Sequence, residues 1–478
     1  MGAALDVPAE FRQWNYRLRR GRNWMLVGLM YSFFYMTRYN FSAVAPTLQT
    51  FFGWSKSDLG LFEFIMPLIY GLAVVVNAPI ADRIGGRKAF LFGAVGVVVM
   101  NLVFGSFHLA ASQPALWFDL GNLAPLLQPL LPNMVHGQLL LQPAQLTGDF
   151  SLRGLAWTMA LLWGVNGYFQ SFGALSIVKI NAQWFHLKER GTFGAIFGVL
   201  IRFGLILAFS GTPLIVAFLP WQWAFWLPAG FVFLLFMGNL LFVAETPRDA
   251  GFDVHDTGDA SGPEEEGRVR VADVLRKVFA SPTMWMIAVA SMMIGIVRRS
   301  VVDAWWPLYF NEVHGVGKTA IAYQVAAWGI ALLGIAGGFA FGIMSDRVYQ
   351  GRRAPVVVFG FLGMMFSLGL FYLVDAVDLG VAGSVAAIVL LSFFVNGAHG
   401  IIGGAASMDF GGKKAAATAA GLFDGMQYLA ASFTGLAVGW ISTNYGWQYW
   451  KLWPIPFALV GAAVMARLWN VKPGRRSH

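Results

Sequence analysis

Seven ionisable side chains fall inside long apolar stretches of the sequence, where a charge is most costly. They are Arg38, Glu63, Arg202, Arg298, Arg299, Asp303 and Asp424. A charge in the middle of a membrane span costs several kcal/mol, so each of these residues is a candidate for function. Four are arginines and three are acids, and the excess positive charge would be balanced by a bound anion.

Two of the arginines, Arg38 and Arg299, are predicted to form an anion site. Each lies about 15 residues into its apolar stretch. A guanidinium offers phosphate or carboxylate two parallel hydrogen bonds and stays protonated when it is desolvated. In the alternative, Arg38 pairs permanently with Glu63, and Arg299 pairs with Asp303 one helical turn away. Arg298 should point about 100° away from Arg299 on a helix and pair or pack rather than bind.

Aromatic and titratable residues are expected around this pair. Tyr31 and Tyr35 share the helical face of Arg38 and are expected to line a cavity, as is Tyr70 in the next stretch. His399 either joins two helices by a hydrogen bond or titrates as a ligand. Arg202 is a further candidate substrate ligand. The candidates for proton transfer or ion pairing are Glu63, Asp303, Asp424 and His399.

The composition indicates that most of the surface faces lipid. Of 478 residues, 57% are hydrophobic and 12% are charged, with a mean hydropathy of +0.61. A soluble domain carries about 25% charged residues. The net charge of +9 resembles that of a nucleic-acid-binding protein. Its basic residues, however, cluster between apolar stretches, as cytoplasmic loops do, so no nucleic-acid partner is expected.

No pattern in the sequence predicts an enzyme. The chain has no cysteine, which excludes disulfides and thiolate ligands. We find no Walker loop, nucleophile–base pair or metal-ligand spacing, and we expect no cofactor and no metal. The N-terminus lacks the apolar core and cleavage site of a signal peptide.

Twelve apolar stretches are long enough to cross a bilayer, which needs about 20 residues each. Segments rich in lysine and arginine alternate with segments that have few, which predicts that both termini are cytoplasmic. We therefore expect a multi-pass protein of the inner membrane. The stretches lie near residues 23–47, 58–81, 89–108, 153–182, 192–218, 222–243, 282–310, 319–345, 354–374, 380–407, 416–441 and 447–468.

A polar segment divides the twelve stretches into two sets of six. The first half contains an uncharged, Leu/Pro/Gln-rich insertion at about 109–152, expected to face outward as a loop or short amphipathic helices, with a substrate gate as the alternative. The expected order is an N-terminal cytoplasmic segment at 1–22, a first half at 23–243, a linker at 244–281, a second half at 282–470 and a cytoplasmic tail at 471–478.

A charged loop occurs once in each half. The stretch from Asp82 to Lys88 recurs as Asp346 to Arg353, an offset of 264 positions. Related halves of this kind are typical of transporters. An acid near a helix end and the basic residues after it can lock neighbouring helix ends together in one state. The residues with this expected role are Asp82, Arg83, Arg87, Asp346, Arg347 and Arg352.

With these motifs in place, the sequence resembles the major facilitator superfamily, and within it the organophosphate:phosphate antiporters. That family includes glycerol-3-phosphate and hexose-phosphate transporters and related sensors. The resemblance rests on YSFFYMTRYNFSAVAP in the first stretch, KERG at 188–191, ETPRDAGF at 245–252, WWPLYF after Arg299, GIMSDRVYQGRR and KKAAATAAG at 413–421.

The resemblance implies an all-α membrane protein of twelve transmembrane helices in two pseudo-symmetric halves. It also implies that Arg38 and Arg299 are the phosphate-binding arginines and that Tyr31, Tyr35 and Tyr70 line the cavity. There are departures: the family's usual aspartate aligns with Ala304, one place after Asp303. Asp424 lacks the lysine partner that some hexose-phosphate members have.

We therefore expect a monomeric secondary transporter that moves a phosphorylated or similar small anion, in exchange for inorganic phosphate, by rocking of the two halves in the bilayer. One alternative is proton-coupled transport of a non-phosphorylated organic anion. A second alternative is a membrane sensor of a sugar phosphate.

Overall fold

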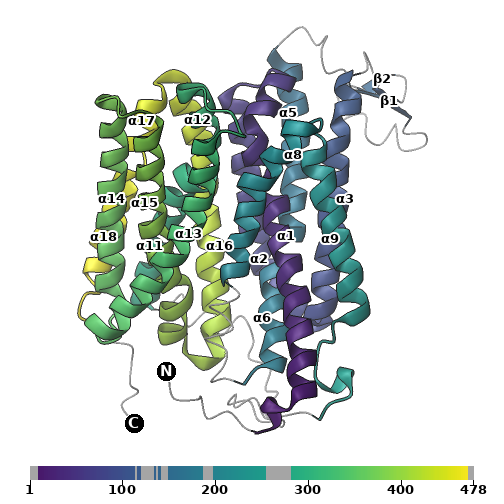
Figure 1. Ribbon diagram of the computed structural model, residues 1–478, viewed down its shortest axis with the longest axis vertical. Helices are drawn as coiled ribbons and strands as arrows, with labels where there is room; N and C mark the ends of the chain where they lie inside the picture. The colour runs from purple at the N-terminus through teal and green to yellow at the C-terminus, as the bar shows by residue number, and fades with distance from the viewer. Residues whose placement is uncertain are drawn as a thin grey trace.

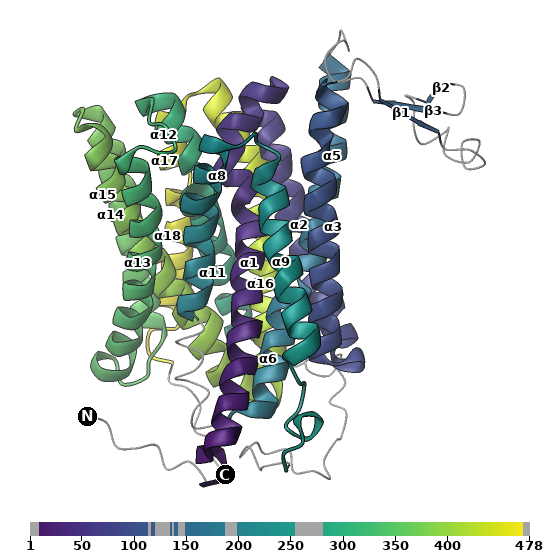
Figure 2. The same cartoon turned by 45° about the vertical axis from the view of Figure 1, so that its right-hand side comes forward.

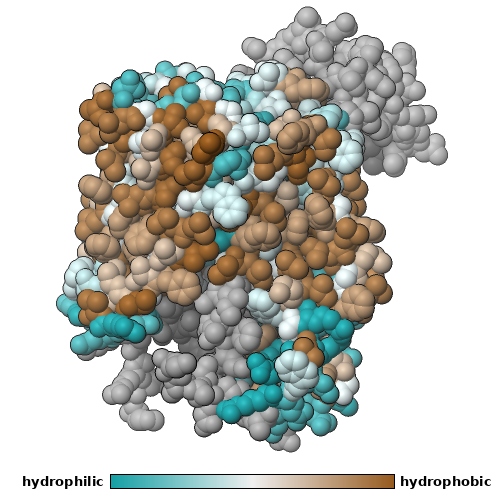
Figure 3. Space-filling view, viewed as in Figure 1, coloured by the Kyte–Doolittle hydropathy of each residue, from teal (hydrophilic) through white to brown (hydrophobic). Residues whose placement is uncertain are grey.

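The protein is a bundle of long helices packed side by side (Figure 1). The computed structural model describes residues 9–112, 116–119, 134–135, 138–141, 149–186, 198–253 and 281–471. The start of α1 and the end of α18, the first and last long helices, lie at one end of the bundle, here called the terminal end, and three short strands lie at the opposite end, here called the strand end (Figure 2). On the face seen in Figure 3, hydrophobic residues cover most of the middle of the bundle, and hydrophilic residues gather mainly near its ends.

Each of the six apolar stretches predicted for the first half is helical where it is described. The fifth combines a helix at 198–206 with a π-helical turn and a further helix. The elements are η1 Ala9–Arg12, α1 Trp14–Phe52, α2 Lys56–Ile84, α3 Gly86–Ser112, α5 Asp149–Gln170, α6 Phe172–Trp184, η3 Leu207–Gly211, α8 Thr212–Phe218, α9 Trp223–Phe242 and η4 Arg248–Ala250.

The second half repeats this arrangement, with π-helical turns in three of its six spans. Its elements are α11 Pro282–Val297, η5 Arg298–Val302, α12 Trp306–His314, α13 Ile321–Ile343, η6 Met344–Val348, α14 Ala354–Ala376, α15 Gly380–Gly400, η7 Ile401–Ala406, α16 Ser407–Asn444, α17 Trp447–Leu452 and α18 Ile455–Ala466.

The helices confirm the predicted fold class. Among the described residues, nine helical stretches are long and apolar enough to cross a membrane. The other three spans are α1, α5 with α6, and α16. Of these, α1, α5 and α16 supply the central polar network described below.

The insertion of the first half contains strands rather than the expected loop or helices. β1 Leu116–Asp119 and β2 Met134–Val135 each pair antiparallel with β3 Gln138–Leu141, and Leu116 lies opposite Leu141. The insertion is rich in proline, which removes backbone donors and disfavours a helix interior. Other parts of the insertion lie outside the described residues.

In the first half, the charged loop connects α2 to α3. Gly85 has φ of 94°, and a Cβ there would approach the Glu245 carboxylate to 2.6 Å. That carboxylate accepts a hydrogen bond at 2.7 Å from the backbone N–H of Gly86, at the start of α3, where the helix dipole favours an anion. Arg87 donates to the carbonyl of Leu240 at 2.5 Å. The loop is thus tied to the ETPR segment.

The corresponding loop of the second half is held by its own arginines. Arg353 pairs with Asp346 at 2.6 Å, and Arg352 donates to the carbonyl of Tyr349 at 3.3 Å. Arg83 and Arg347 are exposed, and the side chain of Asp82 is outside the described part of the chain. The conformational role of this repeated motif stays a prediction.

The two halves meet along α2 and α16, where glycines bring the backbones into contact. A Cβ on Gly60 would lie 2.5 Å from the carbonyl oxygen of Gly435, and the reverse distance is also 2.5 Å. Closer to the strand end, Lys56 Nζ of α2 pairs with Glu312 Oε2 of α12 at 2.8 Å. These contacts close the strand end of the interface between the halves.

Candidate functional site

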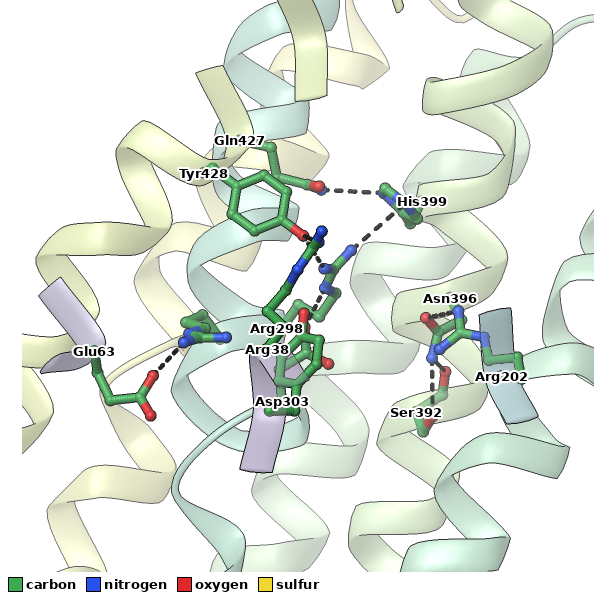
Figure 4. A network of polar contacts seen from close by, with 12 residues as sticks. Arg38, Glu63, Arg202, Arg298, Asp303, Ser392, Asn396, His399, Gln427 and Tyr428 are labelled. Atoms are coloured by element: carbon green, nitrogen blue, oxygen red, sulfur yellow. Dashed lines mark hydrogen bonds and ion pairs between the residues drawn. The ribbon is translucent and has the colours of Figure 1, made fainter. Parts of the chain in front are cut away.

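Arg38 lies in a polar network between the two halves (Figure 4). Its side chain is on α1 and is 1% exposed. Nη1 donates to the Tyr428 hydroxyl at 3.2 Å, while Nε and Nη2 donate to Gln170 Oε1 at 3.4 and 3.3 Å. The guanidinium also lies 4.4 Å from the ring centre of Tyr70 and 4.8 Å from that of Tyr35, within cation–π range.

Arg298 reaches the same tyrosine from the second half. Its Nη2 donates to the Tyr428 hydroxyl at 3.5 Å, and its Nε pairs with Asp303 Oδ2 at 2.6 Å. Two guanidinium groups, one from each half, thus share a single phenol oxygen. The second arginine beside Arg38 is Arg298, not the predicted Arg299.

Arg299 instead forms an ion pair with Glu63 of α2. It is 4% exposed, and its guanidinium lies 5.4 Å from the ring centre of Tyr39. The expected facing pair of Arg38 and Arg299 is therefore not formed. The alternative pairs, Arg38 with Glu63 and Arg299 with Asp303, are not formed either. Glu63 pairs with Arg299, and Asp303 pairs with Arg298.

The π-helical turn η5 explains why Asp303 meets Arg298 rather than Arg299. The backbone N–H of Asp303 donates to the carbonyl of Arg298 at 3.0 Å, a bond between residues five apart. A regular α-helix makes this bond between residues four apart, so the turn holds one extra residue. Face assignments that assumed 3.6 residues per turn were therefore wrong for the segment after Arg298.

Tyrosines form a row along α1. The rings of Tyr31 and Tyr35 meet edge to face at 5.2 Å, and Tyr39 follows at 5.8 Å from Tyr35. Tyr39 donates to Asp303 Oδ2 at 3.3 Å. Tyr39 and Tyr428 were not among the predicted site residues. The regular spacing of four residues from Tyr31 to Tyr35 to Tyr39 is the sequence signal for Tyr39.

His399 connects Arg298 to Gln427. His399 Nε2 is 3.5 Å from Arg298 Nη1, and its Nδ1 is 3.1 Å from the Gln427 amide. An arginine can only donate, so Nε2 must accept, and Nδ1 then carries the proton. The Gln427 nitrogen Nε2 lies at that 3.1 Å and can only donate, so the Gln427 amide should turn its oxygen toward Nδ1. Of the two roles predicted for His399, this geometry favours the helix-to-helix hydrogen bond.

Arg202 and Asp424 lie outside the shared contact at Tyr428. Arg202 is half-buried and donates to the side chain of Asn396 on α15, which in turn donates to Ser392 at 2.9 Å. Figure 4 shows this group apart from Arg38 and Arg298. Asp424 is half-buried on α16, one turn before Tyr428, and makes no hydrogen bond with the described residues; both Arg38 and Arg298 act on its carboxylate electrostatically.

A second buried polar cluster was not predicted. Lys451 of α17 is fully buried, pairs with Asp375 and donates to the Tyr309 hydroxyl at 2.9 Å. His314 Nε2 is 3.0 Å from that hydroxyl and 3.1 Å from Ser384 Oγ. Both charges lie near the ends of predicted spans, where a charge is ordinarily solvated. Within the described residues, no cluster of three metal-ligating side chains is present.

Residues 27–435 match the family described as the Major Facilitator Superfamily. A probable hexose phosphate transport protein of Chlamydia muridarum is 26% identical, over 97% of this chain and 93% of that protein. The glycerol-3-phosphate transporter of Bacillus subtilis is also 26% identical, over 96% of this chain and 94% of that protein. The membrane sensor protein UhpC of Escherichia coli is 23% identical, over 93% of this chain and 89% of that protein.

Solved structures share the fold at lower sequence identity. A bacterial homologue of the human lysosomal transporter Spinster has a TM-score of 0.65 at 14% identity, covering 96% of this chain and 99% of that one. The xylose transporter XylE of E. coli has a TM-score of 0.64, also at 14% identity and with the same coverage.

Proposed function

This chain belongs to the Major Facilitator Superfamily and is a multi-pass membrane protein, and from that premise we propose that it exchanges a small phosphorylated metabolite for inorganic phosphate. Relatives that match nearly its whole length carry the names of hexose phosphate and glycerol-3-phosphate transporters. We place it in the inner membrane with the terminal end in the cytoplasm, because the described basic loops, with Arg83 and Arg347, lie at that end.

The observation that carries this proposal is the convergence of Arg38 and Arg298 on Tyr428. The two cations, Arg38 buried and Arg298 half-buried, come from different halves and repel one another, and a phosphate between them would remove that repulsion. Its oxygens would replace the phenol oxygen as the shared acceptor, and the Tyr428 hydroxyl could then donate to the phosphate. Binding would draw the halves together around a fixed site.

Sequence spacing supports Arg298, rather than Arg299, as the second ligand. The resemblance places the family's aspartate at Ala304, five positions after Arg299. Asp303 follows Arg298 by the same five positions and pairs with it at 2.6 Å. The departure noted from the sequence therefore disappears when Arg298 takes the family's position.

The test is exchange of labelled inorganic phosphate in proteoliposomes. Arg38→Lys and Arg298→Lys each lose the planar fork that fits a phosphate, so we expect kcat/KM to fall about 10- to 100-fold. Arg17→Lys changes an exposed arginine in the first turn of α1, at the terminal end, and should leave exchange unchanged. Exchange at the wild-type rate in both site variants would refute the proposed site.

Asp424 favours a second candidate function, proton-coupled transport of an organic anion. It is a half-buried carboxylate close to the site and has no hydrogen-bond partner in the described part of the chain. Collapsing the pH gradient separates the candidates, since exchange against internal phosphate persists and proton symport stops. Phosphate binding without any flux would instead indicate a sensor.

A further inference from the structure

Arg299 is buried but uses little of its hydrogen-bonding capacity. Its side chain is 4% exposed, and Nη2 is paired with Glu63. Nε and Nη1 are buried and have no hydrogen-bond partner among the described residues. A guanidinium carries five N–H donors, and leaving them unpaired in the interior is costly. This cost calls for a functional explanation.

The ion pair of Arg299 joins the two halves. Glu63 lies on α2, and it also accepts a hydrogen bond at 2.5 Å from Ser42 of α1, so it is held within the first half. Arg299 lies on η5 of the second half. A movement that opens the strand end of the interface would carry Glu63 away together with Ser42. Arg299 would then be left as an unpaired cation.

The Glu63–Arg299 pair lies nearer the strand end than Arg38 does. α1 runs toward the strand end (Figure 1), so Ser42 is one helical turn beyond Arg38. α2 runs back, so Glu63 lies about two turns closer to the strand end than Tyr70. An anion that enters from the strand end would meet Arg299 before it meets Arg38.

We infer that Arg299 and Arg298 bind the transported phosphate group in turn. In the state open to the strand end, the anion replaces Glu63 on Arg299. In the state described here, Arg299 is paired with Glu63, and the anion site is formed by Arg298 and Arg38. Tyr39 lies beside both arginines, over Arg299 and hydrogen-bonded to Asp303, the partner of Arg298. This relay rests on the proposed function and applies to phosphate and its monoesters.

The test compares phosphate affinity at the two faces of the membrane. Exchange of labelled inorganic phosphate is measured in right-side-out and inverted vesicles, which gives a half-saturating concentration for each face. The variants are Glu63→Gln and the double change Glu63→Gln with Arg299→Gln. The double variant removes both charges, so it leaves no unpaired charge that could unfold the protein.

We expect the double variant to raise the half-saturating concentration about 10- to 100-fold at the strand-end face. At the terminal-end face the change should stay below about threefold, because Arg38 and Arg298 are intact. Glu63→Gln alone keeps Arg299 and removes its competitor. It should therefore lower the half-saturating concentration at the strand-end face.

Lys56→Gln is the matched control. It also breaks an ion pair between the halves at the strand end, with Glu312 at 2.8 Å, but removes no proposed anion ligand. A change of the same direction and size in all three variants would mean that Arg299 only holds the halves together, and the relay would be wrong. Equal changes at both faces, or none, in the double variant would also refute it. Absence of phosphate exchange by the wild type would refute both the relay and the proposed function.

Discussion

At the residue scale, one hydroxyl group joins the two arginines of the site. Tyr428 accepts hydrogen bonds from Arg38 and Arg298, and its ring lies 4.4 Å from that of Tyr70. The phenol thus fills the place where an anion would sit between two cations. It also offers a donor that the described contacts leave unused.

Tyr428→Phe is expected to weaken phosphate binding about tenfold, because the ring stays and one hydrogen bond to the anion is lost. The half-saturating concentration for phosphate exchange measures this. Tyr323→Phe is the matched control: that hydroxyl is buried on α13 with no partner among the described residues. Equal effects of the two substitutions would contradict a specific role for Tyr428.

Lys451 is expected to contribute to the stability of the fold rather than to phosphate binding. Lys451→Met leaves the Asp375 carboxylate without its cation, and because that carboxylate is 28% exposed we expect a cost of about 2 kcal/mol, below that of a fully buried pair. We expect a lower midpoint of thermal unfolding, followed by tryptophan fluorescence in detergent. Adding Asp375→Asn removes the stranded charge and should restore part of the loss. A double variant less stable than Lys451→Met would show that the charge is not the cause.

At the scale of elements, the π-helical turn η5 decides which arginine Asp303 meets. Asp303 pairs with Arg298, which also contacts Tyr428, while the adjacent Arg299 pairs with Glu63. The tryptophan Trp450 donates to the carbonyl of Ser300 in this turn at 2.6 Å, which fixes the turn against α17.

Deletion of Val302 removes the extra residue and should convert the turn to a regular α-helix. One segment must then rotate by about 100°, so both arginines cannot keep their partners. Misplacement of this kind can cost about 100-fold in rate. Phosphate exchange by purified, monodisperse protein is the measurement. Deletion of Gly317, in the exposed connection after α12, is the control and should retain exchange.

At the scale of the whole molecule, close contact of α2 with α16 holds the strand end shut. A Cβ on Gly435 would lie 2.5 Å from the Gly60 carbonyl oxygen and 2.6 Å from the backbone of Glu63 and Phe64. No flexible side chain is available there to move aside. The closed arrangement therefore depends on the absence of side chains at this crossing.

Gly435→Ala should push the halves apart at the strand end. The chain contains no cysteine, so a single Ser442→Cys, buried at 2% exposure on α16, reports opening without background. Labelling with a membrane-impermeant maleimide should become about tenfold faster, which corresponds to about 1.4 kcal/mol. Gly230→Ala on α9, which has no atom within 4 Å of the added Cβ, is the control. Unchanged labelling in Gly435→Ala would contradict this closure.

The sequence by itself determined the twelve spans, the two halves and the family, because these depend on local composition and on motifs that repeat along the chain. It also identified the buried charges as a group, since a charge within an apolar stretch is conspicuous wherever it points. Arg38, Tyr35 and Tyr70 are gathered at the centre as predicted, and their role in binding stays a proposal.

Only the tertiary structure decided which charge meets which. The direction of a side chain on a long helix depends on every turn before it, and the extra residue of one π-helical turn pairs Asp303 with Arg298 rather than with Arg299. Partners such as Arg38 and Tyr428 are 390 positions apart, and their approach depends on how the halves pack. Local pattern carries no information on that packing, because the same apolar surfaces and glycine contacts can join helices in several rotations.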